Sequence, residues 1–146
     1  AAGDLPGLSL ARARQVHRVT GALLVAAVLL HVGGLWLTSP PDVVDALLFV
    51  SPTPFSLWGV IAMWAVFAAA LLAATRRRLP LRPMTWRRAH VGLAIVIACT
   101  TVAHALLIGG TMEEVAKFIL CAGVMAAGLR VAMLRGLWPW ASSRQR

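Results

Sequence analysis

The chain has 146 residues, of which 60% are apolar and only 13% are charged, and its net charge is +9. An ordinary soluble domain is about half apolar and about a quarter charged, and a chain this short has too much surface for its volume to bury so many apolar side chains. The composition therefore excludes a disordered chain, a nucleic-acid-binding domain and a common cytosolic enzyme. It indicates an integral membrane protein.

Four apolar stretches are long enough to cross a hydrocarbon layer, which takes about 20 residues. They cover about residues 16–37, 55–75, 89–109 and 115–134. A further apolar segment, at about 42–50, is too short to span and is expected to form a short helix at the outer surface. No stretch alternates with the period of a barrel strand. We therefore predict an all-α integral membrane protein, with a bundle of four transmembrane helices as one membrane domain over residues 1–146.

The distribution of charge predicts the orientation of these spans. Arginines gather before or at the start of the first span, between the second and third spans, and towards the end of the chain: Arg12, Arg14, Arg18, Arg76, Arg77, Arg78, Arg82, Arg87, Arg88, Arg130, Arg135, Arg144 and Arg146. The opposite side holds Asp42, Asp45, Glu113, Glu114 and Lys117. Because cytoplasmic loops are enriched in Lys and Arg, we expect both termini to be cytoplasmic, in a multi-pass protein of a bacterial-type inner membrane.

Tryptophans fall near the ends of the predicted spans, where interfacial indoles are common. Trp36 and Trp58 are expected at the outer interface, and Trp86, Trp138 and Trp140 at the inner one.

The four histidines form two pairs with the same spacing. His17 and His31 lie in the first span, His90 and His104 lie in the third, and each pair is 14 positions apart. At about 100° per residue, this spacing falls about 40° short of four full turns, so both members of a pair point to roughly the same helix face, about 21 Å apart along the axis.

The first and third spans run in the same direction. His17 and His90 are therefore expected near the cytoplasmic end, and His31 and His104 near the outer end. If the two helices face each other, each depth has two imidazoles that can hold one iron, with the porphyrin between the helices. An iron with two histidine ligands has no free coordination position, which suits electron transfer. We therefore predict two haem b groups, held between helices 1 and 3.

Arginines, threonines and cysteines near the histidines have possible roles beside the predicted haems. Arg18, Arg87 and Arg88 are placed to pair with the propionates of the inner haem. Thr20, Thr100 and Thr101 could accept an imidazole N–H, although a bond to the carbonyl of their own helix is the preferred interpretation for each. Cys99 and Cys121 could form a thiol pair, although packing is the preferred role.

Alternative uses of the histidines lack supporting residues. Packing is the simplest alternative, but ionisable side chains within spans are rare and usually functional. A zinc site would lack its third and fourth ligands, and a non-haem iron triad would lack its carboxylate, because neither span contains an acid. A retinal protein needs a lysine inside a span, whereas Lys117 lies near an outer end.

Two segments resemble the haem helices of the ferric reductase-like transmembrane domain superfamily. They are QVHRVTGALLVAAVLLHVGGLW (15–36) and WRRAHVGLAIVIACTTVAHALLIGG (86–110). The superfamily includes ferric reductases, NADPH oxidases and the haem subunit of periplasmic methionine-sulfoxide reductase. The resemblance implies that His17 and His90 hold an inner b haem and that His31 and His104 hold an outer one. Members usually have six spans, whereas four are predicted here, and no flavin or nicotinamide domain is expected after them.

These features lead to one preferred function and two alternatives. We expect a di-haem b-type cytochrome subunit of an oxidoreductase complex, which carries electrons across the bilayer between partner redox proteins, or quinol, and an outer-side acceptor. Its other partner is membrane lipid, and no nucleic acid is expected. One alternative is a self-contained metalloreductase, a ferric reductase, in which the outer acids gather cations. The other is a non-redox structural subunit of a larger membrane complex.

Overall fold

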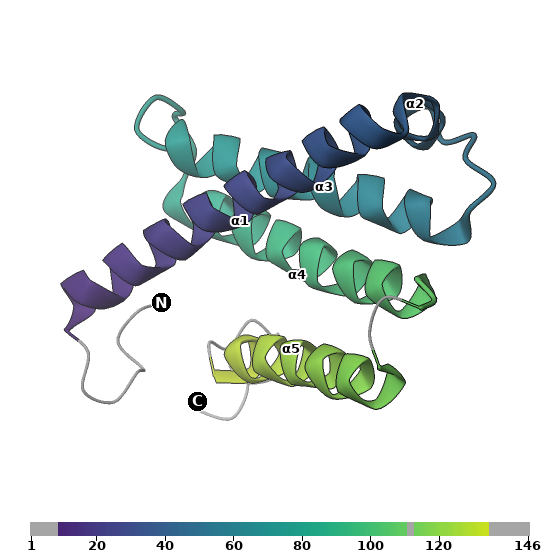
Figure 1. The fold of residues 1–146 in the computed structure, drawn as a ribbon. Coiled ribbons are helices and arrows are strands. Elements are labelled where there is room, and N and C mark those ends of the chain that lie inside the picture. The colour runs from purple at the N-terminus through teal and green to yellow at the C-terminus, as the bar shows by residue number, and fades with distance from the viewer. Residues whose placement is uncertain (1–8, 111–112, 135–146) are drawn as a thin grey trace.

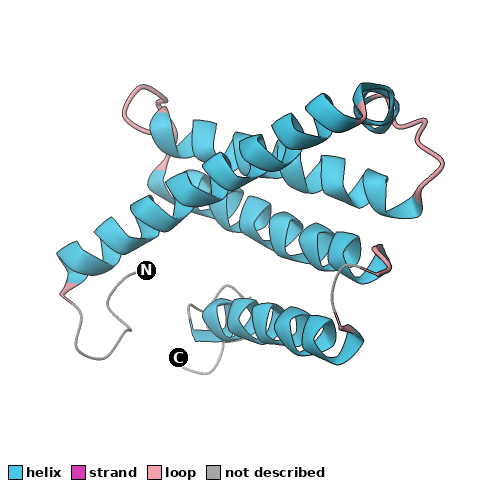
Figure 2. Cartoon of the chain, in the orientation of Figure 1, coloured by secondary structure: helices cyan, strands magenta, loops and turns pink. Residues whose placement is uncertain are grey.

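The fold, seen in a computed structural model, is described for residues 9–110 and 113–134 (Figure 1). All regular structure in these two ranges is helical, as Figure 2 shows, and this confirms the predicted all-α class. The helices are α1 (Leu10–Thr38), α2 (Pro40–Leu47), α3 (Pro54–Ala74), α4 (Pro83–Leu107) and α5 (Glu114–Leu134).

The helices begin at residues that suit a helix N-terminus. The Ser9 hydroxyl caps α1 by accepting the backbone N–H of Arg12 at 3.4 Å. Helices α2, α3 and α4 each start with proline, whose missing N–H costs nothing in the first turn. The Glu113 carboxylate accepts the N–H of Ala116 at 2.9 Å at the start of α5.

Three helices, α1, α3 and α4, are long and apolar enough to cross a membrane, so the chain is a multi-pass membrane protein by length and composition. The predicted spans 16–37, 55–75 and 89–109 fall on these helices, with the last residues of the second and third just beyond the helix ends. The predicted range 115–134 lies within α5, and its role as a fourth span stays a prediction. The predicted outer segment 42–50 overlaps the short helix α2.

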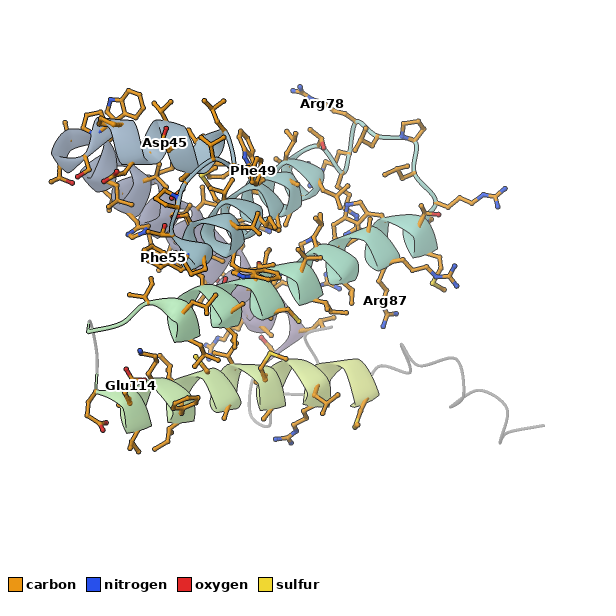
Figure 3. The ribbon with its side chains drawn as sticks, turned by 90° about the vertical axis from the view of Figure 1, so that its right-hand side faces the viewer. Asp45, Phe49, Phe55, Arg78, Arg87 and Glu114 are labelled. Carbon is orange, nitrogen blue, oxygen red and sulfur yellow. The ribbon has the colours of Figure 1, made fainter. Side chains whose placement is uncertain are left out.

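Helices α1 and α4 run in the same direction, and α3 and α5 run in the opposite direction (Figure 1). Figure 3 shows the labelled arginines, Arg78 and Arg87, at one end of the bundle and the labelled acids, Asp45 and Glu114, at the other. The helices therefore separate the two kinds of charge in space, as the positive-inside interpretation requires.

Helix α3 is the centre of the packing. It packs against α4, α1 and α2, while α5 packs against α4. Its buried residues are Val60, Ala62, Met63, Ala65 and Val66, several of them small enough for helix backbones to approach closely. By contrast, α1 has one buried residue, Ala13, and leaves large apolar side chains such as Leu30 exposed.

Helices α1 and α4, which carry the histidines, do not pack against each other within the described residues. Each lies instead against α3. The space between these two histidine-bearing helices is therefore bridged by side chains and not by close backbone packing.

The junction of α4 and α5 depends on a buried lysine. Lys117 is only 3% exposed, and its ammonium donates to the Ile108 carbonyl at 2.8 Å and to the Glu114 carboxylate at 2.9 Å. The cation thus lies at the C-terminal end of α4, where the helix dipole favours positive charge.

We expect Lys117→Met to lower the stability of the protein in detergent by about 1–2 kcal/mol, because the Ile108 carbonyl loses its donor. Thermal unfolding followed by circular dichroism measures this effect. Arg130→Met is the matched control, since it removes one exposed cation from the same helix. Equal unfolding midpoints for the two variants would contradict the assigned role of Lys117.

Candidate functional site: the histidine pairs of α1 and α4

The inner histidines, His17 on α1 and His90 on α4, are in contact. Their ring centroids lie 6.0 Å apart and their planes are almost perpendicular, at 83°. This contact joins two helices whose backbones do not pack against each other. The pairing of His17 with His90, which the sequence suggested from spacing and topology, is thus present in the fold as a side-chain contact.

The separation of this pair suits a metal between two imidazoles. A ligating histidine nitrogen lies about 2 Å from its metal, which places the two ring centroids about 6 Å apart. The observed centroid separation is 6.0 Å. The Nδ1 atom of His90 is also buried without a hydrogen-bond partner. A buried, unsatisfied nitrogen is costly in a purely structural residue and is common at functional sites.

Trp86 stacks on His90, and Arg76 in turn lies over Trp86. The indole of Trp86 lies parallel to the imidazole, with the ring centroids 5.1 Å apart and the planes 9° from parallel. The Trp86 Nε1–H donates to the Leu72 carbonyl near the end of α3, at 3.1 Å. The Arg76 guanidinium lies over the Trp86 ring, 4.4 Å from its centroid. The sequence predicts Trp86 only as an interfacial residue, although its position four residues before His90 is the spacing that places two side chains on one helix face.

The outer histidine of α4, His104, is oriented by α3. Its Nδ1 lies 2.8 Å from the carbonyl oxygen of Phe55, and its ring also makes an edge contact with the Phe55 ring. Because a carbonyl can only accept, Nδ1 carries the proton in this bond and Nε2 keeps its lone pair. Metal-ligating histidines usually show this arrangement, with the second ring nitrogen donating to a backbone carbonyl or a carboxylate.

Gly59 allows the His104 ring to pack closely against α3 because it has no side chain. A Cβ atom at this position would lie 2.7 Å from Cε1 of His104 and 2.8 Å from its Nδ1. Only a residue without a side chain allows the ring to lie this close. Spacing on α4 gives no hint of this requirement, because Gly59 belongs to the helix between the two histidine helices.

The structure does not bring His31 and His104 together as it does the inner pair. His31 is exposed on α1, and within the described residues no ring contact joins it to His104. Of the two predicted outer ligands, His104 is therefore oriented by α3, whereas His31 is exposed on α1.

The arginines predicted near the inner haem are free for a ligand. Arg18, Arg87 and Arg88 are exposed, and no acidic side chain in the described part of the chain pairs with them. Arg87 projects outward at the basic end of the bundle in Figure 3. Arg135, Arg144, Arg146, Trp138 and Trp140 lie outside the described residues.

Thr20 and Thr100 bond to carbonyls of their own helices. The hydroxyl of Thr20 donates to the Val16 carbonyl at 3.0 Å, and that of Thr100 to the Val96 carbonyl at 2.7 Å, which confirms the preferred interpretation for these two threonines. Cys99 is an exposed free thiol and Cys121 a buried one. Among the residues described, no three His, Cys, Asp or Glu side chains gather as a metal-binding group.

Long apolar helices in alternating directions, two of them with histidines, define a multi-pass membrane protein. The family model described as "Ferric reductase like transmembrane component" matches residues 2–108, which include both histidine helices. The chain belongs to this family, which makes it a membrane redox component and confirms the resemblance drawn from the sequence. No curated protein and no solved structure matches it significantly. Members of the family typically bind haem, and the inner histidine pair fits such a group.

Proposed function

We propose that this chain is a di-haem b-type cytochrome subunit that carries electrons across a membrane. The observation that supports this proposal best is the contact of His17 with His90 at 6.0 Å between centroids, made between helices that do not otherwise pack together. A pair of imidazoles from two separate helices is the ligand arrangement of bis-histidine haem sites in helical bundles.

Each residue of the proposed sites has a defined task. His17 and His90 hold the inner haem, and His31 and His104 hold the outer one. Held between two histidines, a haem would supply reversible one-electron transfer and would leave no coordination position for oxygen. The Phe55 carbonyl holds the tautomer of His104, and the exposed Arg18, Arg87 and Arg88 receive the inner propionates.

The same proposal includes a topology of four spans, with α5 as the fourth. Both termini and the arginine-rich connection between α3 and α4 face the cytoplasm, in a bacterial-type inner membrane. The separation of the arginines from the acids along the bundle supports this orientation. The inner haem then lies near the cytoplasmic surface and the outer haem near the opposite one, so that together they cross the hydrocarbon layer.

Electrons pass between partner redox proteins, or quinol, and an acceptor on the outer side, within an oxidoreductase complex. The alternative of a self-contained metalloreductase depends on the outer acids. Two of these have local partners, since Glu113 caps α5 and Glu114 pairs with Lys117. This leaves Asp42 and Asp45 on α2 as the acids without such a bond among the described residues, which weakens the case for a cation-gathering surface.

The proposal predicts two b haems per chain in the purified protein. A reduced-minus-oxidised spectrum identifies low-spin b haem, and a pyridine haemochrome assay against protein concentration counts it. Two haems per chain would support both sites, and one would restrict the proposal to a single pair. A protein that assembles in the membrane without haem would contradict the proposal and favour a structural subunit.

A further inference from the structure

Trp86 lies between the basic connection of the bundle and the inner histidine pair. It is half-buried, its ring is parallel to the His90 ring, and its N–H is bonded within the protein to Leu72. An interfacial anchor would direct its N–H to lipid headgroups or water. Trp64 on α3 offers the contrast, because it is 56% exposed and its one aromatic contact among the described residues is an edge contact with Phe67.

We propose that Trp86 is a positioning residue that orients the imidazole of His90, and that Arg76 and the Leu72 carbonyl hold Trp86 in place. The consequence for the haem rests on the proposed function. The orientation of His90 does not rest on the proposed function, because it follows from contacts within this chain.

The stack with Trp86 restricts rotation of the His90 ring about χ2. Rotation about χ2 of histidine is broad, so a helix backbone alone does not define the plane of the ring. A parallel indole four residues earlier on the same helix face, 5.1 Å away between centroids, favours one plane over the others. His90 needs such a restraint because its buried Nδ1 has no hydrogen bond to orient it, unlike Nδ1 of His104.

Trp86 is in turn held from two directions. Leu72 is in the last turn of α3, where carbonyls have no intrahelical donor, and the indole N–H satisfies one of them at 3.1 Å. Arg76, just after α3, places its guanidinium 4.4 Å from the ring centroid, within the range of a cation–π interaction. The end of α3 thereby determines the position of a ring on α4.

Histidine labelling of the haem-free protein tests this orientation without depending on the proposed function. Diethyl pyrocarbonate labels accessible imidazoles. Trypsin cuts after Arg18 and Arg88, which separates His17 from His90, and fragmentation of the tryptic peptide 89–117 in the mass spectrometer then distinguishes His90 from His104. We expect Trp86→Leu to raise the labelling rate of His90 about two- to tenfold, which corresponds to the usual strength of an aromatic pair. Trp86→Phe should stay near wild type because it keeps a ring.

Trp64→Leu is the matched control and should leave the labelling of His90 unchanged. Equal rates in Trp86→Leu and Trp64→Leu would overturn the proposal. So would a Trp86→Phe rate as high as that of Trp86→Leu, because an aromatic stack would then not be the cause.

A second measurement uses the protein with haem. Electron paramagnetic resonance reports the orientation of axial imidazoles, and we expect Trp86→Leu to shift the signal of the inner haem only. Arg76→Gln should shift it in the same direction, whereas Arg78→Gln, which removes the same charge from a side chain that points away from the bundle in Figure 3, should not. An unchanged inner signal in Trp86→Leu would overturn the role of Trp86 at the haem. A haem-free wild-type protein would instead refute the proposed function and leave the labelling result to decide the orientation of His90.

Discussion

Replacing His90 by alanine is expected to remove the inner haem and to leave the outer haem bound, so that the haem content falls by half. The reason is that His17 would remain as the single histidine of the inner pair, while His31 and His104 would be unchanged. Haem content by pyridine haemochrome, with the number of low-spin signals by electron paramagnetic resonance, measures the outcome.

Two controls separate the loss of a ligand from the loss of the fold. Exogenous imidazole should enter the space that His90→Ala leaves and restore the missing low-spin signal, which it would not do in a misfolded protein. His31→Ala should show the complementary result, with loss of the outer haem and retention of the inner one. A His90→Ala protein that keeps both haems would refute the ligand assignment, and one that loses both would refute the independence of the two sites.

The histidine pairs were accessible to sequence reasoning because they depend on simple geometry. A separation of 14 residues places two side chains on one helix face, and the order of the spans together with the distribution of charge gives the direction of each helix. The contact of His17 with His90 agrees with this reasoning. The same reasoning does not extend to His31 and His104, because helix tilt determines whether two faces meet at both depths. In Figure 1, α1 crosses α3 and α4 obliquely and does not run parallel to them.

The contacts that orient the histidines were not accessible from the sequence. Spans are apolar on all sides, since lipid tails and protein cores both accept apolar side chains, so periodicity does not reveal which face of α3 is buried. The Phe55 carbonyl and Gly59 contact His104 because α3 packs closely against α4. Neither a backbone carbonyl nor a glycine in a span stands out in the sequence, and Trp86 stands out only as an interfacial residue.

Gly59→Ala is expected to have the largest effect of any substitution away from the histidines. The added Cβ would lie 2.7 Å from Cε1 of His104, closer than folded structures allow. Either the ring moves and loses its bond to the Phe55 carbonyl, or α3 and α4 separate, with overpacking of this kind costing about 1–3 kcal/mol. Loss of the partner that orients a ligating histidine typically weakens metal binding about 10- to 100-fold.

We therefore expect Gly59→Ala to lose the outer haem selectively, as measured by haem content and by the remaining low-spin signal of the inner haem. Gly92→Ala is the matched control, because a Cβ there meets no atom within 4 Å and alanine favours a helix over glycine. If Gly59→Ala kept both haems with unchanged spectra, the close contact of the His104 ring with α3 would not be needed for binding the outer haem, and the prediction would be wrong. Selective loss would instead show that the helix between the two histidine helices, which contributes no ligand, determines whether the outer site can form.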